Sequence, residues 1–455
     1  MRVAIVGAGW AGLAAALQAT RAGHGVTVFE AARTLGGRAR AVAAQGPGGD
    51  PVTLDNGQHI LIGAYTECLA LMRSVGVAES PALLRMPLAL PYADGTGLRL
   101  PDLPPPWDAL VGIGRARGWS WGERWALLRT AAAWRLGGFT CAPQATVAQL
   151  CAHLPVRLQH EFIDPLCVSA LNTPADRSSG TVFLRVLRDS LFSGRGGSHL
   201  LLPRLDLGAL FPEPAARWLR AHGHTVHAGL RVTALRPAGA GVWHVGTAAG
   251  SMPFDAVVLA TPAPEAARLV RGETAGMAAE MAAAGTDWAD QADALRHTAI
   301  ATVYAQHPTA TTTALLPEPM LALRATAQRP AQFVFDRALL GGPAGVLAFV
   351  VSAFEGEREA LERQVLAQAA SELRLDGLRV LRTVVEKRAT FACTPGLRRP
   401  PMRIASGLLA CGDYVDGPYP ATLEGAVRSG TAAADALGPG APEAAGFMTK
   451  SASSA

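Results

Sequence analysis

The sequence has few charges and almost no lysine. Only 17% of its 455 residues are charged, and all but two of its basic residues are arginine. The formal net charge is +5, yet no dense basic run interleaves with aromatic residues, as it does in nucleic-acid-binding proteins. The sequence therefore predicts no nucleic-acid partner. A mild excess of arginine suits an anionic cofactor or a negatively charged membrane face.

Paired cysteines and long hydrophobic runs are also missing. The six cysteines form no C-x-x-C pair and no zinc-site spacing, so we expect no metal site and free buried thiols in a reducing cytoplasm. No stretch of about 18 uninterrupted apolar residues is present, so we predict no spanning helix. The apolar segment Leu13–Ala19 follows a strand pattern and a glycine motif, which argues against a signal peptide.

The first thirty residues have a βαβ pattern. Val3–Val6 is a short apolar run that predicts a buried parallel strand. An Ala- and Leu-rich segment, Leu13–Arg21, predicts a helix, and Val26–Phe29 predicts a second strand that ends in Glu30. The motif Gly-Ala-Gly-Trp-Ala-Gly lies between the first strand and the helix. In this context the motif indicates dinucleotide binding; the alternative is a glycine-rich turn that serves only folding.

Each residue of this motif has a physical task in binding a dinucleotide. Gly7 permits the tight turn, Gly9 lets the backbone approach a pyrophosphate, and Gly12 allows the helix to pack closely on the strand. The helix N-terminus around Ala11 offers N–H groups to the phosphates. Glu30 can accept hydrogen bonds from the ribose hydroxyls and would repel a 2′-phosphate, which favours NAD or FAD over NADP.

The next segment distinguishes FAD from NAD. Residues 35–40 read LGGRAR and resemble the extended fingerprint of the flavin amine oxidase and carotenoid desaturase superfamily. The resemblance implies that Gly36, Gly37 and Arg38 contact the diphosphate of FAD, with Arg38 as a bidentate partner. It also implies contacts to the flavin from Asn56 and Gly57, and to the adenine from the backbone of Val232.

A longer match indicates one group within this superfamily. Residues 55–65 read DNGQHILIGAY, and residues 169–174, 182–191 and 420–430 add to the match. These segments resemble the hydroxysqualene dehydroxylases of bacterial hopanoid biosynthesis, and the resemblance covers nearly the whole chain. It implies reductive removal of the hydroxyl of hydroxysqualene to give squalene, with hydride from reduced flavin. The alternatives are a carotenoid- or phytoene-type FAD-dependent desaturase and a non-catalytic prenyl- or lipid-binding protein on the same fold.

Two turns near the C-terminus add to the cofactor site. A strand that ends in Gly412 and Asp413 is followed by a helix that begins near Thr422 and Leu423. Asp413 can accept a hydrogen bond from a sugar hydroxyl, and the helix N-terminus would stabilise negative charge on a reduced flavin. Glu424, in the first turn, is either a proton donor or an acid that only suits the helix dipole.

We predict an α/β fold with a Rossmann-like FAD-binding domain of the glutathione-reductase type. This domain is expected from residues 1–75, 205–265 and 400–438, with 226–235 and 242–246 pairing as a hairpin. Residues 76–204 and 266–399 are expected to form an inserted α+β substrate domain, with an apolar tunnel between the two domains. Residues 439–455 are expected to be a disordered tail.

The sequence does not mark one residue as the proton donor. His59 is the first candidate, because it follows the flavin-proximal element and histidine donates protons near neutral pH; a structural histidine bonded to backbone is the alternative. Asp189 and Glu424 are weaker catalytic candidates, and Lys387 would act on the flavin only through water. Two polar residues are expected in the tunnel: Asn172 and Thr173.

The segment Trp107–Phe139 carries five tryptophans and five arginines on a helical stretch. This composition suits a membrane interface at which a lipid substrate enters; the alternative is an ordinary amphipathic core helix. We therefore expect a cytoplasmic protein that lies peripherally on the inner face of the plasma membrane.

Overall fold

The computed structural model describes residues 1–46, 49–192, 194–239, 241–272, 279–308 and 314–439. Within these ranges no helix combines the length and the apolarity that a membrane span requires. The expected disordered tail lies outside the described residues, apart from Pro439. All six cysteines are free, and five of them are buried.

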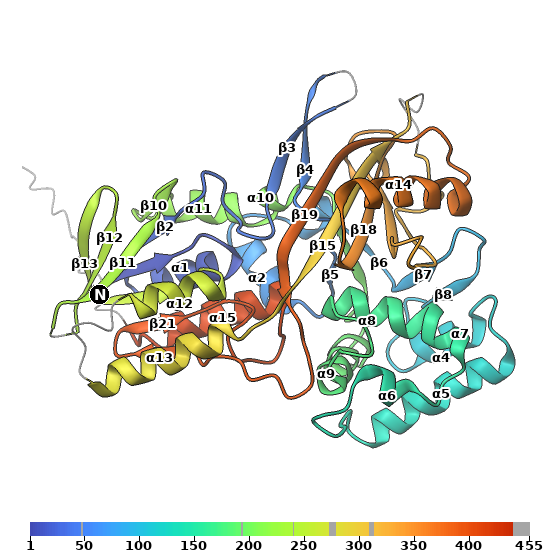
Figure 1. The fold of residues 1–455 in the computed structure, drawn as a ribbon, viewed down its shortest axis with the longest axis horizontal. Helices are drawn as coiled ribbons and strands as arrows, with labels where there is room; N and C mark the ends of the chain where they lie inside the picture. The colour runs from blue at the N-terminus through green and yellow to red at the C-terminus, as the bar shows by residue number, and fades with distance from the viewer. Residues whose placement is uncertain (47–48, 193, 240, 273–278, 309–313, 440–455) are drawn as a thin grey trace, which may run out of the picture.

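A six-stranded sheet forms the half of the molecule that holds the N-terminus, on the left in Figure 1. Its strand order is β10-β2-β1-β14-β21-β20, and all neighbours are parallel except β20 and β21. The predicted βαβ unit is confirmed as β1, α1 and β2. The strands are β1 (Arg2–Val6), β2 (Gly25–Glu30), β10 (Thr225–Ala228), β14 (Ala256–Leu259), β20 (Arg403–Ala405) and β21 (Leu408–Ala410).

Helices cover one face of this sheet and a smaller sheet covers the other. Successive residues of a strand point to opposite faces, so Val3 and Ile5 pack with the helical layer while Ala4 and Val6 pack on the opposite side. The helical layer consists of α1 (Trp10–Arg21), α2 (Thr66–Ser74), α10 (Leu207–Leu210), α11 (Pro212–Ala221) and α15 (Leu423–Asp435). The opposite face carries the antiparallel strands β11 (Val232–Pro237), β12 (Trp243–Thr247) and β13 (Gly250–Phe254).

Two further helices, α12 (Ala263–Arg271) and α13 (Ala279–Asp293), also belong to this half. Trp288 of α13 is buried, and its indole N–H donates to the carbonyl of Pro401 at 2.7 Å, next to β20. Arg271 at the end of α12 forms an ion pair with Asp290 of α13 at 2.8 Å. The expected domain boundary at residue 265 is therefore corrected, because the apolar faces of both helices pack against this half.

The predicted hairpin strand over residues 226–235 is two separate strands. β10 ends at Ala228 and pairs in parallel with β2, whereas β11 begins at Val232 and pairs with β12. Gly229 lies between them with φ +78°, a left-handed conformation that interrupts an extended chain. Only the second part of the alternating segment therefore forms the expected hairpin.

The other half of the molecule contains a five-stranded antiparallel sheet with the order β16-β17-β18-β15-β19. One face packs against α14 (Arg358–Gln368) through Leu361 and Val365. The other face carries Phe333, Phe335 and Val350, which pack into the central core. The strands are β15 (His297–Gln306), β16 (Met320–Ala322), β17 (Phe333–Asp336), β18 (Val346–Phe354) and β19 (Arg379–Phe391).

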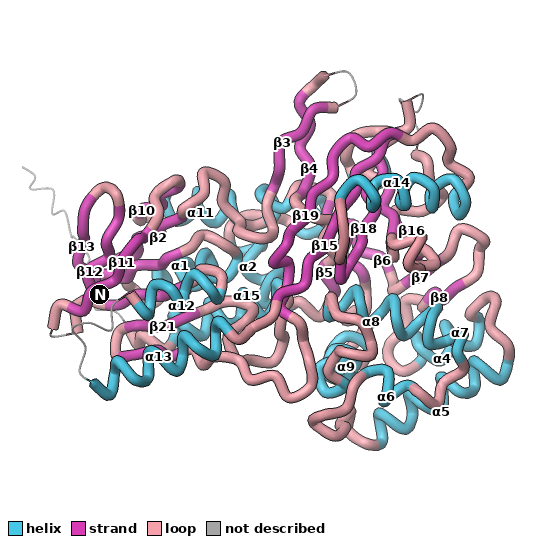
Figure 2. The backbone as a smooth tube through the Cα atoms, viewed as in Figure 1, coloured by secondary structure: helices cyan, strands magenta, loops and turns pink. Residues whose placement is uncertain are grey.

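A layer of helices lies beside this sheet, at the lower right of Figure 2. The layer comprises α4 (Trp107–Arg115), α5 (Trp121–Leu136), α6 (Val147–Cys151), α7 (Val156–Leu158), the π-helix η1 (Gln159–Ile163), α8 (Asp164–Leu171) and α9 (Gly180–Leu191). Short strands join it to the sheets: β5 (Leu61–Ile62), β6 (Leu83–Met86) and β9 (Leu200–Pro203) pair together, as do β7 (Ala89–Pro91) and β8 (Gly97–Arg99). The hairpin of β3 (Ala41–Gln45) and β4 (Pro51–Asp55) projects at the top of Figure 1. The remaining short elements are α3 (Glu79–Ala82), η2 (Ala338–Leu340) and η3 (Ala369–Leu373).

Candidate functional site

A cavity of about 1000 Å³ is lined by residues from both halves of the molecule. At one end its wall is the glycine turn after β1 together with Glu30 and residues 36–40. At the other end its wall is mainly apolar, with side chains from β16, β17, β18, α8 and α9. The apolar wall includes Leu88, Leu90, Leu166, Leu187, Met320, Phe333, Phe335 and Val350.

The turn between β1 and α1 has the shape that a diphosphate requires. Gly7 has φ +114°, and a Cβ there would lie 2.6 Å from the carbonyl oxygen of Ala260, so only glycine fits. A Cβ on Gly12 would lie 2.0 Å from the Gly7 carbonyl oxygen, which makes Gly12 a packing residue behind the wall. Gly9 precedes α1 as its N-cap and lines the cavity with Ala11. The first turn of α1 therefore directs its N–H groups towards the cavity.

Glu30 lies at the end of β2 with its carboxylate held by the backbone. Its Oε2 accepts the N–H of Ala8 at 2.8 Å, and its Oε1 accepts the N–H of Ala32 at 2.8 Å. A carboxylate oxygen has two acceptor sites, so each oxygen can also accept a ribose hydroxyl. The residue lines the cavity, which fits the expected adenosine end of FAD.

Arg38 joins three distant segments around the cavity. Its guanidinium forms an ion pair with Asp413, and its Nη1 donates to the carbonyl of Ala389 at 2.9 Å. Both terminal nitrogens thus have protein acceptors, which differs from the expected bidentate contact with phosphate. Asn56 holds the loop in place, because its amide donates to the Arg38 carbonyl at 2.7 Å and accepts the N–H of Arg40 at 3.1 Å.

The C-terminal turns bring the remaining predicted cofactor residues to the same cavity. Thr422 caps α15, with its Oγ1 accepting the N–H of Gly425 at 2.9 Å. The N–H of Gly412 donates to Ser429 of α15 at 2.7 Å, which ties the end of β21 to this helix. The predicted cofactor residues that line the cavity are Gly7, Gly9, Ala11, Glu30, Gly36, Gly37, Arg38, Asn56, Gly57, Val232, Gly412, Asp413, Thr422 and Leu423.

His59 lines the cavity with one ring nitrogen engaged. Its Nδ1 lies 2.8 Å from the carbonyl oxygen of Gly57, and since a carbonyl only accepts, Nδ1 carries the hydrogen. The other nitrogen, Nε2, is then the atom that can exchange a proton. Burial lowers the pKa of His59; the Gly57 hydrogen bond raises it, and the charge of Arg38 lowers it further. The ring is therefore held mainly neutral near pH 7.

The structure places the other catalytic candidates differently. Asp189 lines the cavity, but its carboxylate forms ion pairs with Arg188 at 2.7 Å and Arg185 at 3.5 Å. Glu424 is fully buried and does not line the cavity; its carboxylate accepts backbone N–H groups of α2. Glu424 is therefore removed from the candidates, because it is a structural acceptor.

Two further expectations are corrected. Lys387 is exposed on β19 and does not line the cavity, although both of its sequence neighbours do. Thr173 is buried and also lies outside the lining, since its hydroxyl donates to the carbonyl of Leu171. Asn172 does line the cavity, and its side chain joins α8 to Thr390 at 2.9 Å and to the N–H of Ala353 at 2.6 Å.

Several polar residues of the lining were not predicted from the sequence, among them Tyr65, Tyr419 and Gln58. Tyr65 ends the segment that carries His59, and Tyr419 precedes the α15 turn. Burial and the charge of Asp189 raise the pKa of Tyr419. Gln58 lines the cavity and accepts the guanidinium of the buried Arg337 at 2.9 Å. Tyr65 and Gln58 lie inside the motif of residues 55–65 and could have been found there. No sequence pattern indicated that Arg337 would hold Gln58.

Comparisons with known proteins agree with this geometry. Residues 10–438 match the model of the flavin containing amine oxidoreductases. The hydroxysqualene dehydroxylase of Rhodopseudomonas palustris is 28% identical over 451 residues, which cover 95% of this chain and 97% of that protein. The hydroxysqualene dehydroxylase of Zymomonas mobilis is 27% identical, with the same shares of both chains covered.

Other matches are shorter or concern the fold alone. The zeta-carotene desaturase of Synechocystis is 39% identical, but only over 80 residues, or 18% of this chain. The crystal structure of an oxidoreductase from Methanosarcina mazei aligns with a TM-score of 0.73 and 17% identity, covering 96% of this chain and 100% of that one. The nearly full-length family match, together with the glycine turn and Glu30, leads to one conclusion: the chain belongs to the flavin containing amine oxidoreductase family and is an FAD-dependent oxidoreductase.

Proposed function

We propose that this protein is a hydroxysqualene dehydroxylase, which reductively removes the hydroxyl group of hydroxysqualene to give squalene for hopanoid biosynthesis. The observation that carries the proposal is the continuity of the cavity. One space joins the phosphate-binding turn at Gly7 to a wall of apolar side chains such as Leu166, Met320 and Phe335. A C30 isoprenoid needs such a wall, because burying its surface away from water is the main source of its binding free energy.

The reaction requires a hydride and a proton. When bound, reduced FAD supplies the hydride that replaces the hydroxyl group. The carbon–oxygen bond breaks, the oxygen takes up one proton and leaves as water, and the product has a new carbon–hydrogen bond. The protein must hold the chain, deliver that proton and keep other water away. The apolar wall serves the first and the third of these tasks.

His59 remains our proposed proton donor. Its Nδ1 is fixed by the Gly57 carbonyl, so that Nε2 can donate when the ring is protonated. Asp189 is the weaker alternative, since its carboxylate is already engaged in ion pairs with Arg185 and Arg188.

The cofactor contacts are proposed residue by residue. The N–H groups around Gly9 and Ala11 would hold the diphosphate, and Glu30 the ribose of the adenosine. The N-terminus of α15 at Thr422 would stabilise negative charge on the reduced ring. Because Arg38 and Asp413 pair with each other, we propose that they act together and hold the polar end of the cavity closed around the cofactor.

Two other functions use the same features. A carotenoid-type desaturase needs the same cofactor and tunnel, but the relatives of that name match only a small part of this chain. A non-catalytic lipid-binding protein would have no need for the intact glycine turn and Glu30, which are both present.

We also propose that the enzyme works in the cytoplasm as a peripheral protein on the inner face of the plasma membrane, where its substrate resides.

Product analysis tests the proposed reaction. The FAD-loaded protein is reduced without oxygen and incubated with hydroxysqualene, and oxidised protein is incubated in parallel with phytoene. We expect squalene from the first incubation and unchanged phytoene from the second. Conversion of phytoene to a more unsaturated product, with hydroxysqualene unchanged, would overturn the proposal in favour of a desaturase.

A further inference from the structure

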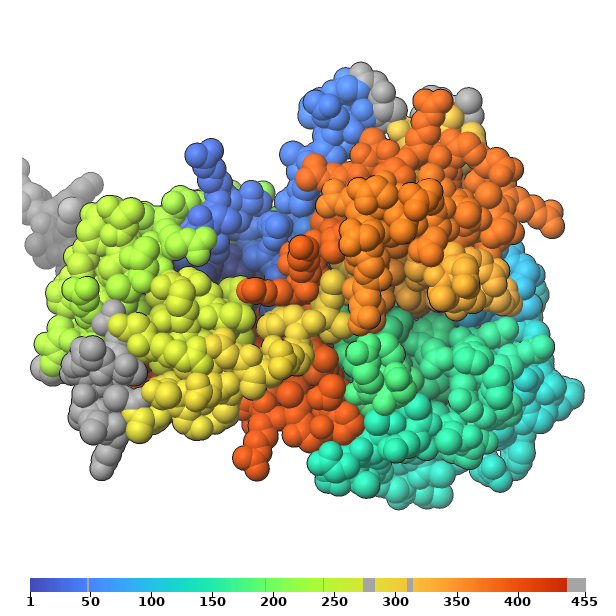
Figure 3. Space-filling view, in the orientation of Figure 1, coloured from blue at the N-terminus to red at the C-terminus, as the bar shows by residue number. Residues whose placement is uncertain are grey.

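Large apolar side chains are exposed mainly on one part of the surface. Among the described residues nine such side chains are exposed, and six of them lie between residues 103 and 136. Trp107 and Leu110 lie on α4, and Trp121, Trp125 and Leu136 lie on α5, with exposures from 41% to 89%. These five side chains are called the tryptophan face below. Helices α4 and α5 lie at the lower right of Figure 3.

This face is not an ordinary packing surface. Helix α5 has 16 residues but buries only Leu127 and Thr130. Trp121, Trp125 and Leu136 recur at intervals of four and eleven residues, so they share one side of the helix. An amphipathic core helix would turn such residues inward. Exposed apolar side chains that gather on two neighbouring helices in this way indicate an interaction site.

The exposed charged side chains of segment 103–140, which carries the tryptophan face, are all arginines. Arg115, Arg117, Arg129 and Arg135 are exposed on or next to the two helices. The two acidic residues of segment 103–140 are not available to balance them. Asp108 is buried, and the Glu123 carboxylate accepts the N–H of Ser120 at 2.7 Å in the helix cap. Tryptophan with arginine is the composition of helices that lie in an anionic lipid interface.

The same charges argue against a second copy as the occupant. A two-fold contact places one patch against the same patch of the other molecule. Here that contact would bring the exposed arginines of both copies together, and segment 103–140 offers no exposed carboxylate to pair with them. A surface of anionic phospholipid complements this charge instead.

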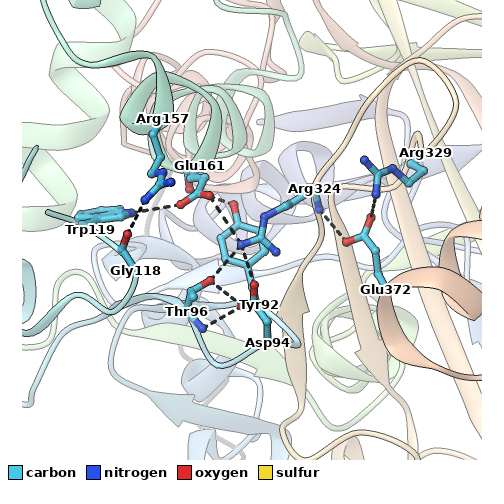
Figure 4. Close-up of polar contacts among 10 residues, drawn as sticks. All are labelled: Tyr92, Asp94, Thr96, Gly118, Trp119, Arg157, Glu161, Arg324, Arg329 and Glu372. Carbon is cyan, nitrogen blue, oxygen red and sulfur yellow. Dashed lines mark hydrogen bonds and ion pairs between the residues drawn. The ribbon is translucent and has the colours of Figure 1, made fainter.

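The tryptophan face is firmly attached to the walls of the cavity. In the turn between α4 and α5, the Trp119 indole donates to Glu161 of η1 at 3.3 Å, and Arg157 donates to the Gly118 carbonyl at 2.6 Å (Figure 4). Glu161 in turn pairs with Arg324 at 3.6 Å, just beyond β16. η1 continues into α8 and β16 contains Met320, and both α8 and Met320 contribute to the cavity wall.

A second link runs along α9. Trp134 of α5 packs edge-on against Phe183 of α9, with ring centroids 6.4 Å apart. Val186 and Leu187, in the next turn of α9, line the cavity. A chain of contacts through α5 and α9 therefore connects the tryptophan face with the apolar wall of the cavity.

We propose that the tryptophan face docks on an anionic phospholipid membrane and so holds the helices that carry the apolar wall of the cavity near the lipid phase. This inference rests on the proposed function for its purpose, since a C30 substrate dissolves in the bilayer. Trp107, Trp121 and Trp125 insert at the headgroup level, and Arg129 and Arg135 contact lipid phosphates. The docking is peripheral, because the side chains that insert come from helices that are packed into the fold.

Vesicle flotation tests the proposal without any substrate. FAD-loaded protein is mixed with vesicles of phosphatidylcholine, or of phosphatidylcholine with phosphatidylglycerol. We expect wild type to float with the anionic vesicles and the triple variant W107A/W121A/W125A to bind about tenfold less or weaker still. The double variant R129E/R135E should lose only the preference for phosphatidylglycerol. The matched control is W218A, on α11 in the other half.

Several results would overturn the docking proposal. The first is equal flotation of wild type and the triple variant. The second is a wild type that floats with neither vesicle. A dimer that the triple variant dissociates, without flotation of wild type, would identify a second copy as the occupant. Retained flavin absorbance and an unchanged melting temperature show that the variants fold. Failure of the dehydroxylation assay leaves the flotation result intact, so the two proposals fail separately.

Discussion

The carboxylate of Glu424 accepts the backbone N–H of Cys68 at 3.0 Å and so closes the N-terminus of α2 from a helix 356 residues later in the chain. Its other oxygen accepts the N–H of Glu67 at 3.1 Å and the guanidinium of Arg428 at 2.7 Å. A helix N-terminus needs acceptors for its first N–H groups. The fully buried carboxylate of Glu424 supplies these acceptors. A side chain with two acceptor oxygens explains why an acid occupies this position.

Substitution of Glu424 should therefore affect stability before catalysis. Glu424→Ala leaves buried N–H groups and Arg428 without their acceptor, and we expect the free energy of unfolding to fall by about 3–5 kcal/mol. Glu424→Gln keeps one acceptor oxygen and should lose less. Urea unfolding followed by flavin fluorescence measures both variants, with the exposed Glu213→Ala as control. If Glu424→Ala is as stable as wild type but has lost turnover, Glu424 is a catalytic residue after all.

Glu30→Gln should weaken binding of FAD. The amide loses a charge-assisted hydrogen bond to the ribose, which predicts a rise in the Kd for FAD of about 10- to 100-fold. Titration of the apoprotein with FAD, followed by the quenching of flavin fluorescence, gives the Kd. Glu318→Gln, on an exposed ion pair with Arg99, is the control. An unchanged Kd would remove Glu30 from the ribose site.

The rate of turnover should rise as the pH falls. Burial lowers the pKa of His59, so the imidazolium that donates from Nε2 forms only below the ordinary histidine range, near 6.5. We expect kcat to increase from about pH 8 to about pH 6, and His59→Asn to lower kcat by about 10²- to 10⁴-fold with a flat profile. His153→Asn, outside the cavity lining, serves as control. If kcat depends on pH in the same way in His59→Asn and in His153→Asn, His59 is not the donor.

Asp55 should make the protein less stable as the pH rises. Burial raises the pKa of its carboxyl to about 6, whereas the unfolded chain has a value of about 4. Between these two pH values the carboxyl of Asp55 is protonated in the folded state but ionised in the unfolded chain. The free energy of unfolding therefore falls as the pH rises from the lower value to the higher one. Asp55→Asn stays neutral, so it should raise the melting temperature at pH 8 more than at pH 4.5 in thermal scans. An equal change at both pH values would contradict the assigned shift.

Local patterns explain why the first βαβ unit was predictable. The glycines, the apolar strand and Glu30 all lie within thirty residues, and each has a direct physical reason. The cavity lining at Thr422 and Leu423 was predicted through the resemblance of the segment around them. Local or motif signals predicted most of the cofactor residues that line the cavity, but Gly12, Thr173 and Glu424 lie in the same motifs and do not line it.

Long-range pairings were not predictable in the same way. No pattern connects Arg38 with Asp413, which are 375 residues apart, or Glu424 with Cys68. The packing of α12 and α13 against the cofactor-binding half was not predicted, because the apolar face of a helix does not indicate which surface it packs against. Gly229 was missed because one glycine in an alternating run changes the backbone direction without changing the periodicity.

The most direct measurement follows the flavin of the reduced protein during a single turnover without oxygen. On addition of hydroxysqualene we predict that flavin absorbance returns to the oxidised spectrum and that one squalene forms for each flavin oxidised. Addition of squalene itself should leave the spectrum unchanged. A flavin that stays reduced in the presence of hydroxysqualene, with no squalene formed, would contradict the account.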